Sequence, residues 1–232
     1  MKNIFVHTQN VKNFIAAMKE SENAGKDPAL LAFVGQAGRG KTSAAKFFAA
    51  QNGWVYVRAL TGWTELWMLQ DLCFELKLDP IPYRKKPAFE AIVKALRKNP
   101  QTLVMDEADK MGEVLLDWVR DLADITYVPI ALVGERQLVR KMQKERRIWS
   151  RTLRLVEFEP ITTMDIMFFA KQAADLALSA QQAEVLRESS EGDFRLVARD
   201  VRRIEELYAV NKADRVTDEM VKTAVKMGLR GK

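Results

Sequence analysis

The sequence predicts an α/β domain built on a parallel sheet, followed by a small domain made only of helices. Short apolar runs rich in β-branched residues alternate with helical patterns, and unbroken apolar strands are typical of a parallel sheet covered on both faces. After Pro160 no further strand pattern appears, and amphipathic helices follow one another. We therefore expect the strand and helix alternation over about residues 28–160, with domains at 1–161 and 162–232.

Five segments are expected to form the strands, and helical patterns separate the first four. The strand segments are LLAFVG (30–35), WVYVRAL (54–60), TLVMDEAD (102–109), VPIALVG (128–134) and the more alternating LRLVEFEPI (153–161). The helical patterns are TSAAKFFAAQ (42–51), TELWMLQDLCFELKL (64–78), KPAFEAIVKALRKN (86–99) and VLLDWVRDLAD (114–124). Because strands and helices alternate, right-handed crossovers are expected to join parallel neighbours.

Four helices are expected in the second domain, with candidate starts at Thr163, Ser179, Gly192 to Asp193 and Thr217. Ser179 and Thr217 are favourable N-cap residues, because a hydroxyl accepts a hydrogen bond from an early backbone N–H group. Gln182 follows Ser179 at the spacing of a capping box. At the other end of the chain, residues 1–27 form a segment ahead of the first strand.

A glycine-rich loop with the pattern GxxxxGK[ST] lies between the first expected strand and the helix after it. Small residues let backbone N–H groups surround phosphate oxygens there, and the helix N-terminus adds a favourable dipole. Lys41 is expected to reach the β and γ phosphates of ATP, and the Thr42 hydroxyl to bind Mg²⁺. The expected nucleotide-binding residues of this loop are Gly35, Gln36, Ala37, Gly38, Arg39, Gly40, Lys41, Thr42 and Ser43.

Two adjacent acids, Asp106 and Glu107, end the third expected strand. Asp106 is expected at the carboxyl edge of the sheet beside the phosphate loop, where its carboxylate can hold Mg²⁺ through water. Glu107 can polarise the attacking water as a general base. The pair predicts an ATPase, because most small-molecule kinases of this fold lack the second acid.

The formal net charge of +6 and the pI near 9.4 favour a polyanionic partner such as nucleic acid. No apolar run approaches the length of a membrane span, and the N-terminus lacks a signal-peptide pattern. The one cysteine, Cys73, cannot form an internal disulfide and is expected to be a small buried hydrophobe. We expect a reducing, cytoplasmic location.

With the phosphate loop, the segment DEADK and the trailing helices, the chain resembles AAA+ ATPases. Within them it is similar to the transposition helper group, which includes the phage Mu B protein, IstB and TnsC. That similarity is carried by WVYVRALTGWTELWMLQDLCFEL and by LVGERQL with the arginine-rich segment after it. The resemblance implies a three-layer sandwich with a parallel five-stranded sheet in the order 5-1-4-3-2, and a helical lid over the nucleotide. It also implies a homo-oligomer, as a ring, spiral or filament, with ATP between subunits, in the cytoplasm of a bacterium or phage-infected host.

The resemblance assigns a role to the segment RRIWSRTLR (146–154), in which four residues are arginine. AAA+ ATPases carry an arginine finger just before the fifth strand, so Arg151 is the first candidate and Arg147 the second. A guanidinium can form two parallel hydrogen bonds to the γ-phosphate of a neighbour's ATP. The surplus charges are open to three interpretations: a salt-bridged subunit interface, contact with the DNA backbone, or a solvated face.

Three further positions take their expected roles from the resemblance. GDFRLVARD resembles the start of the lid helix that carries the second sensor, which would place Arg195 at the γ-phosphate of its own subunit; a solvent-facing arginine is the alternative. Glu135 stands where the family usually has an Asn or Thr that places water. The N-terminal segment of relatives packs near the adenine, so His7 and Thr8 are candidates for that wall, with a structural histidine as the alternative.

In a ring or spiral, the loops after the second strand and before the third would line a central passage for duplex DNA. A few lysine, arginine and hydroxyl contacts per subunit give sequence-tolerant, salt-sensitive binding. For the run RKK, a solvated turn is the alternative. The expected DNA contacts are Arg58, Thr61, Trp63, Thr64, Arg84, Lys85 and Lys86.

We expect a DNA-binding ATPase that assembles on DNA with ATP, recruits or stimulates a DDE-type transposase at the target site, and dissociates after hydrolysis. A replicative helicase loader or another DNA-replication AAA+ protein would share the same ATP chemistry. A small-molecule P-loop kinase is disfavoured by Glu107 and the expected lid. A nucleotide-gated scaffold that hardly hydrolyses ATP is a further alternative, because of Glu135.

Overall fold

The structure is a computed structural model that describes residues 1–2, 4–22 and 29–229. It divides into two compact units. The α/β unit comprises Asn13–Gln36 and Lys41–Phe158, and the helical unit comprises Met1–Lys12, Ala37–Gly40 and Glu159–Lys232. The sequence-based division after residue 161 into independent domains stays a prediction.

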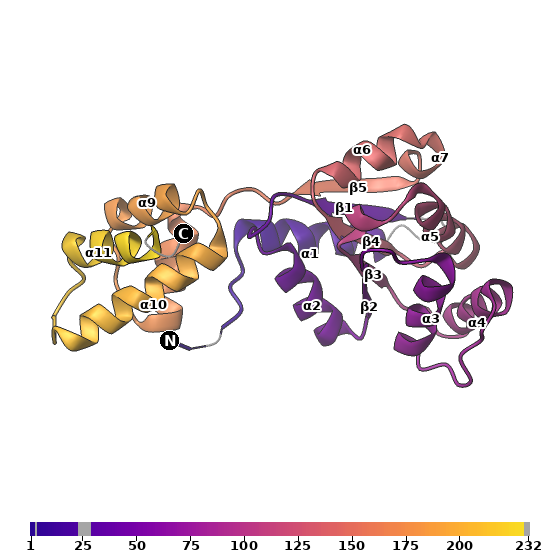
Figure 1. The fold of residues 1–232 in the computed structure, drawn as a ribbon, viewed down its shortest axis with the longest axis horizontal. Helices are drawn as coiled ribbons and strands as arrows, with labels where there is room; N and C mark the ends of the chain where they lie inside the picture. Colours follow the sequence, from indigo (N-terminus) through magenta and orange to yellow (C-terminus); the bar gives the residue numbers. More distant parts are fainter. Residues whose placement is uncertain (3, 23–28, 230–232) are drawn as a thin grey trace. The chain divides into compact units, whose positions relative to one another are not determined.

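The α/β unit is built on one sheet of five parallel strands (Figure 1). The strand order is β2-β3-β4-β1-β5, which confirms the order expected from the sequence. The observed strands are shorter than the apolar runs that predicted them, because the runs continue into the loops. Their bounds are β1 Leu30–Val34, β2 Val55–Arg58, β3 Leu103–Asp106, β4 Ile130–Gly134 and β5 Thr152–Glu157.

Helices cover both faces of this sheet. Alternate residues of β1 point to opposite sides: Leu30 and Ala32 enter a core cluster with residues of α3 to α6, whereas Phe33 contacts Phe14 of α1. The ring centroids of Phe14 and Phe33 are 4.3 Å apart, and Phe48 of α2 lies 5.8 Å from Phe14. The result is a three-layer sandwich. Its helices are α1 Gln9–Glu22, α2 Lys41–Asn52, α3 Glu65–Glu75, α4 Lys85–Lys98, α5 Glu113–Thr126, α6 Gln137–Lys144 and α7 Arg146–Trp149, with the short 3₁₀ helix η1 at Ala108–Lys110.

The helical unit has its own apolar core, which includes Val6 from the N-terminal segment. Its helices are α8 Thr163–Ala174, α9 Ala180–Ser189, α10 Phe194–Val210 and α11 Asp218–Leu229. Ser179 caps α9 in a capping box with Gln182, as predicted. The Thr217 hydroxyl accepts a hydrogen bond from the Met220 N–H group at 3.3 Å, which supports the start of α11.

Three helices were not predicted, namely α1, α6 and α7. In α1, Phe14 and Met18 are fully or nearly fully buried one turn apart, and in α6 Leu138 and Met142 have the same spacing. The signal was present as pairs of apolar residues, but the many charged neighbours of α6 and α7 favoured a turn. No helix in the described part of the chain combines the length and apolar character needed to cross a bilayer.

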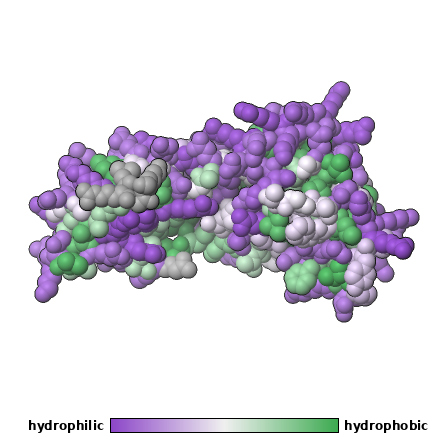
Figure 2. All heavy atoms as spheres, in the orientation of Figure 1, coloured by the Kyte–Doolittle hydropathy of each residue, from purple (hydrophilic) through white to green (hydrophobic). Residues whose placement is uncertain are grey.

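Figure 2 shows a largely hydrophilic face, with apolar and pale residues gathered over the region of α3 and α4. The exposed large apolar side chains there include Trp67 and Phe74 of α3 and Tyr83 just before α4. Basic residues Arg84, Lys85 and Lys86 follow Tyr83 directly. This corner of the α/β unit therefore combines aromatic and cationic side chains at its surface.

Candidate nucleotide site

The phosphate loop connects β1 to α2, as the sequence predicts, and three of its residues have backbone conformations that favour glycine. Gly35, Gly38 and Gly40 have φ values of 155°, 78° and 90°. A Cβ atom on Gly35 would lie only 2.6 Å from the Phe158 carbonyl oxygen. The loop therefore requires glycine both for its curvature and for its contact with the chain after β5.

Lys41 lies at the start of α2, and its ammonium points back into the loop. Its Nζ donates hydrogen bonds to the carbonyl oxygens of Gly35 at 2.7 Å and Gln36 at 2.8 Å. The side chain is buried, and burial lowers its pKa, although the charges of Glu135 and Asp106 oppose that shift. Within the described residues Lys41 makes no ion pair. A buried cation held only by loop carbonyls fits an anionic phosphate as its counter-charge.

Asp106 ends β3 beside Thr42, the second residue of α2. The Thr42 hydroxyl donates to Asp106 Oδ1 at 3.2 Å, and the Glu107 N–H group donates to the same oxygen at 2.9 Å. The carboxylate is nearly inaccessible, with Asp106 only 2% exposed. A hydroxyl and a carboxylate side by side next to a phosphate loop are oxygen donors of the kind that Mg²⁺ prefers, so these residues fit the expected metal.

Glu107 has a left-handed backbone conformation, with φ of 57°, which turns its carboxylate away from the strand direction. Arg58 pairs with Oε1 at 3.0 Å and Lys110 with Oε2 at 3.2 Å. Burial alone would raise the pKa of Glu107, but hydrogen bonds and charge from Lys110 and Arg58 outweigh burial and lower it. Glu107 is therefore ionised at neutral pH, as a general base must be.

Asp109 links the end of β3 to the end of β4, a connection that the sequence analysis missed. Its Oδ1 accepts from the Glu135 N–H group at 3.0 Å, and its Oδ2 accepts from Gln137 Nε2 at 2.8 Å. Lys141 Nζ donates to the Asp109 carbonyl oxygen at 2.6 Å. This carboxylate thus fixes the backbone at Glu135, the position expected to carry the first sensor. The only signal in the sequence was a second acid soon after Asp106.

The tip of the phosphate loop, Ala37–Gly40, groups with the helical unit. The Gly38 carbonyl accepts a hydrogen bond from the Phe194 N–H group at 2.9 Å, and Arg39 donates to the Glu191 carbonyl at 2.7 Å. Asp193 caps α10 by accepting from the N–H groups of Arg195 and Leu196. Arg195 is exposed in the first turn of this helix, next to the residue that contacts Gly38. Its role as second sensor stays a prediction.

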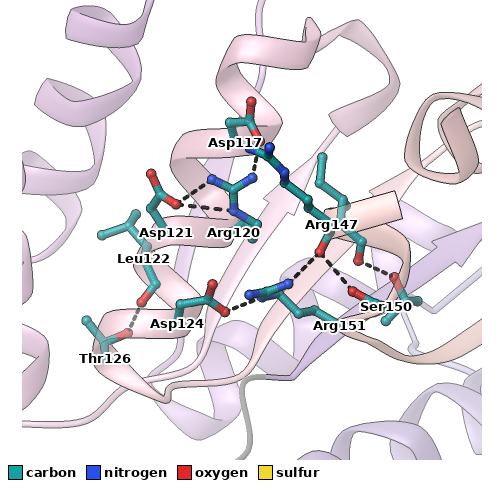
Figure 3. A network of polar contacts seen from close by, with 11 residues as sticks. Asp117, Arg120, Asp121, Leu122, Asp124, Thr126, Arg147, Ser150 and Arg151 are labelled. Carbon is teal, nitrogen blue, oxygen red and sulfur yellow. Dashed lines mark hydrogen bonds and ion pairs between the residues drawn. The ribbon is translucent and has the colours of Figure 1, made fainter. Parts of the chain in front are cut away.

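The arginine-rich segment is organised around Arg151 (Figure 3). Arg151 Nε pairs with Asp124 of α5 at 2.5 Å, and its Nη1 donates to the Arg147 carbonyl at 2.8 Å. Arg151 therefore ties α7 to α5 within one chain. The Arg147 side chain is exposed, and none of the described residues forms a hydrogen bond or ion pair with its guanidinium. Arg151 is thus engaged within the chain and Arg147 is not, and which of the two is the finger stays a prediction.

Trp63 does not belong among the candidate DNA contacts. Its side chain is 7% exposed and packs in the core of the α/β unit, and its indole N–H group donates to Asp71 at 2.8 Å. A buried side chain cannot contact a duplex, so this part of the prediction is wrong. The burial follows from the loop after β2, which turns the tryptophan toward the apolar face of α3.

The other six candidate DNA contacts lie wholly or partly at the surface, and several already have partners. Arg58 pairs with Glu107, Lys85 with Glu65 at 3.0 Å, and Lys86 with Glu90 at 3.8 Å. The Thr64 hydroxyl accepts from Trp67 N–H and caps α3. Thr61 and Arg84 are exposed. Exposed ion pairs of this kind are weak, so they leave the cations available to phosphate.

His7 is exposed and stacks edge-on against Phe5, with ring centroids 5.5 Å apart. The Thr8 hydroxyl accepts from the Val11 N–H group at 3.4 Å near the start of α1. Both residues belong to the helical unit, and their expected place beside the adenine stays a prediction. In the described residues no group of histidine, cysteine and acidic side chains could hold a metal by itself.

Comparison with known proteins finds relatives in sequence and, separately, solved structures with a similar fold. The chain is 25% identical over 230 residues to the ATP-dependent target DNA activator B of Escherichia phage Mu, covering 95% of this chain and 72% of that protein. It is 30% identical over 140 residues to the protein of the same description from Escherichia phage D108, covering 60% of this chain and 44% of that protein. Among solved structures, the Aeropyrum pernix ORC2 protein in its ADPNP-ADP complexes has a TM-score of 0.71 at 16% identity, covering 97% of this chain and 70% of that one.

The ORC2 likeness shows the fold, and the phage proteins show distant homology along most of the chain. The family assignment comes from a protein-family model described as an AAA domain, which matches residues 24–142. That match includes the phosphate loop, Asp106 and Glu107 at the end of β3, and most of α6. The chain belongs to the AAA domain family.

Proposed function

We propose that the chain hydrolyses ATP with Mg²⁺ and uses this cycle to assemble on duplex DNA, where it recruits or stimulates a transposase. The observation that carries the proposal is the grouping of Lys41, Thr42, Asp106 and Glu107 at one edge of the sheet. The phage relatives, described as ATP-dependent target DNA activators, support the DNA and transposition parts.

Each residue of this group has a distinct part in the proposed reaction. Lys41 exchanges its two carbonyl partners for phosphate oxygens and neutralises their charge. Thr42 and Asp106 would hold Mg²⁺, which supplies further charge neutralisation when bound. Glu107 orients and polarises the water that attacks the γ-phosphate. Releasing Glu107 from Arg58 and Lys110 costs little, because partly exposed ion pairs contribute at most about 1 kcal/mol each.

Assembly is proposed to complete the site in trans. Arg147 extends from α7 and would reach the γ-phosphate held by a neighbouring copy, while Arg151 and Asp124 hold α7 in place. Arg58 and Thr61, with the RKK run (84–86), would contact DNA phosphates without reading bases. Binding should therefore tolerate sequence and weaken steeply with salt.

Electron microscopy and sedimentation with duplex DNA at low salt test the proposal. We expect large assemblies with Mg²⁺-ATP and DNA that disperse as ATP is consumed. Glu107→Gln should form the same assemblies and keep them, and Lys41→Ala should form none. Wild-type particles that stay monomeric with ATP and duplex would rule the proposal out. Parallel pull-downs with a transposase and a replicative helicase distinguish the helicase-loader alternative.

A nucleotide-gated scaffold is the second candidate, and Glu135 favours it. A glutamate just after the end of β4, in place of the usual Asn or Thr that places water, suits slow hydrolysis. In that case ATP binding alone would control assembly. If Glu107→Gln leaves the lifetime of the assemblies unchanged, the scaffold is the better description.

A further inference from the structure

Tyr56 of β2 connects two neighbouring strands through its hydroxyl group. Its Oη donates a hydrogen bond to Asp106 Oδ2 of β3 at 2.6 Å. In the β2–β3 register, Tyr56 lies opposite Val104 and Arg58 lies opposite Asp106, so the phenol extends two residues along the sheet to reach the carboxylate. Its neighbours Val55 and Val57 enter the core on the opposite face of the sheet. Tyr56 and Asp106 therefore share the face on which α2 packs.

This hydrogen bond accounts for the oxygen of Asp106 that the phosphate loop does not contact. Oδ1 accepts from the Thr42 hydroxyl and from the Glu107 N–H group. Oδ2 accepts from Tyr56. With donors on both oxygens, the carboxylate cannot rotate without breaking a hydrogen bond in a nearly inaccessible site, which is costly.

We propose that Tyr56 is a positioning residue for the metal site, which holds Oδ2 of Asp106 so that Oδ1 stays directed toward Thr42 and the metal. The inference rests on the proposed function, because it concerns the Mg²⁺ that accompanies ATP. Hydrogen-bond partners that orient metal-binding side chains commonly change metal affinity by about 10- to 100-fold when they are removed.

The surroundings of Tyr56 suit a permanent hydrogen-bond donor. A phenol hydroxyl has a proton to donate, and Asp106 Oδ2 accepts it at 2.6 Å. The ammonium of Lys46 lies 5.6 Å from the centre of the ring and holds it from the α2 side. Because these contacts involve the ring, Tyr56→Phe removes the hydroxyl and preserves the packing.

The test compares the affinity for a fluorescent ATP analogue in excess EDTA with the affinity in saturating Mg²⁺. The ratio of the two affinities measures how strongly the metal couples to the nucleotide. For Tyr56→Phe we expect this ratio to fall by about 10-fold, with the affinity in EDTA unchanged. Tyr127→Phe is the matched control, because Tyr127 is half-exposed at the end of α5 on the opposite edge of the sheet.

A second arm asks whether Tyr56 acts through Asp106. In an Asp106→Asn background, Tyr56→Phe should change the ratio by less than about twofold, because the carboxylate it orients is gone. An unchanged ratio in the single variant, or an equal fall in both affinities, would overturn the inference. Wild-type protein that binds no nucleotide at all would instead refute the proposed function.

A fluorine label keeps the inference testable if the phenylalanine variant folds poorly. Meta-fluorotyrosine at position 56 retains both the ring and the hydroxyl. Its fluorine resonance should shift when Mg²⁺ is added to the protein with the ATP analogue bound, and the same label at position 127 should show no shift. If the resonance at position 56 does not shift on addition of Mg²⁺, the proposed role of Tyr56 in the metal site is contradicted.

Discussion

Asp106 and Glu107 are adjacent in the sequence, yet the fold gives them opposite surroundings. Asp106 is buried among three hydrogen-bond donors, from Thr42, Tyr56 and its own neighbour's backbone. Glu107 is partly exposed, and its left-handed backbone directs its side chain toward Arg58 and Lys110. One carboxylate is thereby held in place, as the proposed metal site requires, and the other is partly exposed and paired only with cations. This difference in environment separates a structural role from a reactive one.

The pH dependence of hydrolysis should report the cations around Glu107. A general base works when ionised, so activity falls as the pH drops through its pKa. Lys110 and Arg58 lower that pKa against the opposing effect of burial. The double variant Arg58→Met, Lys110→Met removes both cations, and burial then raises the pKa of Glu107 without opposition from them. The acid limb of the kcat/KM profile should therefore move to higher pH.

The matched control for this experiment removes two cations elsewhere. Arg97 and Lys98 lie in the last turn of α4, which leads into the start of β3, whereas the acids stand at the end of that strand, and Arg97→Met, Lys98→Met makes the same change in net charge. Its acid limb should coincide with that of the wild type. A limb that moves equally in both double variants would mean that net charge, not the local ion pairs, sets the profile.

At the residue level, sequence predicted the phosphate loop and both acids, because those motifs depend on local spacing. Tyr56 and Asp109 were missed, because their roles depend on pairing between strands. Tyr56 reaches Asp106 only through the β2–β3 register, and Asp109 meets Glu135 only because β3 and β4 are neighbours. The expected DNA contact of Trp63 was misplaced for a related reason, because the burial of its side chain depends on where α3 packs.

At the scale of elements, apolar strands and N-caps were predictable, whereas helices with strongly charged surfaces were not. The buried run of β1 and the capping box of Ser179 carry their signals within a few residues. In α6 only Leu138 and Met142 are buried, and lysines and arginines fill much of its remaining surface. Such a helix depends mainly on tertiary packing for its stability. A short stretch of sequence does not show those tertiary contacts.

The start of α10 is an element whose stability can be tested directly. The Asp193 side chain accepts hydrogen bonds from the N–H groups of Arg195 and Leu196. Asp193→Ala should lower the free energy of unfolding by about 1 kcal/mol, because those N–H groups lose their acceptor. Urea unfolding followed by circular dichroism measures the change. Asp193→Ser retains a capping oxygen and should stay close to wild type; a serine variant as unstable as the alanine variant would contradict this explanation.

At the scale of the whole molecule, the two units each have a core of their own, and Arg147 in the arginine-rich segment has an exposed side chain with no partner among the described residues. Arg151 holds the four-residue helix α7 in place through two contacts. One is its ion pair with Asp124, and the other is its hydrogen bond to the Arg147 carbonyl. A short helix so restrained would carry Arg147 in a defined direction. In the proposed assembly, Arg147 would point toward the γ-phosphate of the ATP that a second copy binds.

Mixing two inactive variants tests whether Arg147 completes a neighbour's site. Arg147→Ala keeps its own pocket but lacks the finger, and Glu107→Gln keeps the finger but lacks the base, so each alone should turn over ATP poorly. In a random equal mixture within a symmetric assembly, about a quarter of interfaces join an intact pocket to an intact finger, and about a quarter of wild-type turnover should return. Arg154→Ala, which removes an exposed arginine paired with Glu20, should retain wild-type turnover by itself. If the mixture co-assembles but stays inactive, Arg147 does not act in trans. If a mixture of Arg151→Ala with Glu107→Gln regains turnover instead, Arg151 is the finger. Its ion pair with Asp124 must then open on assembly.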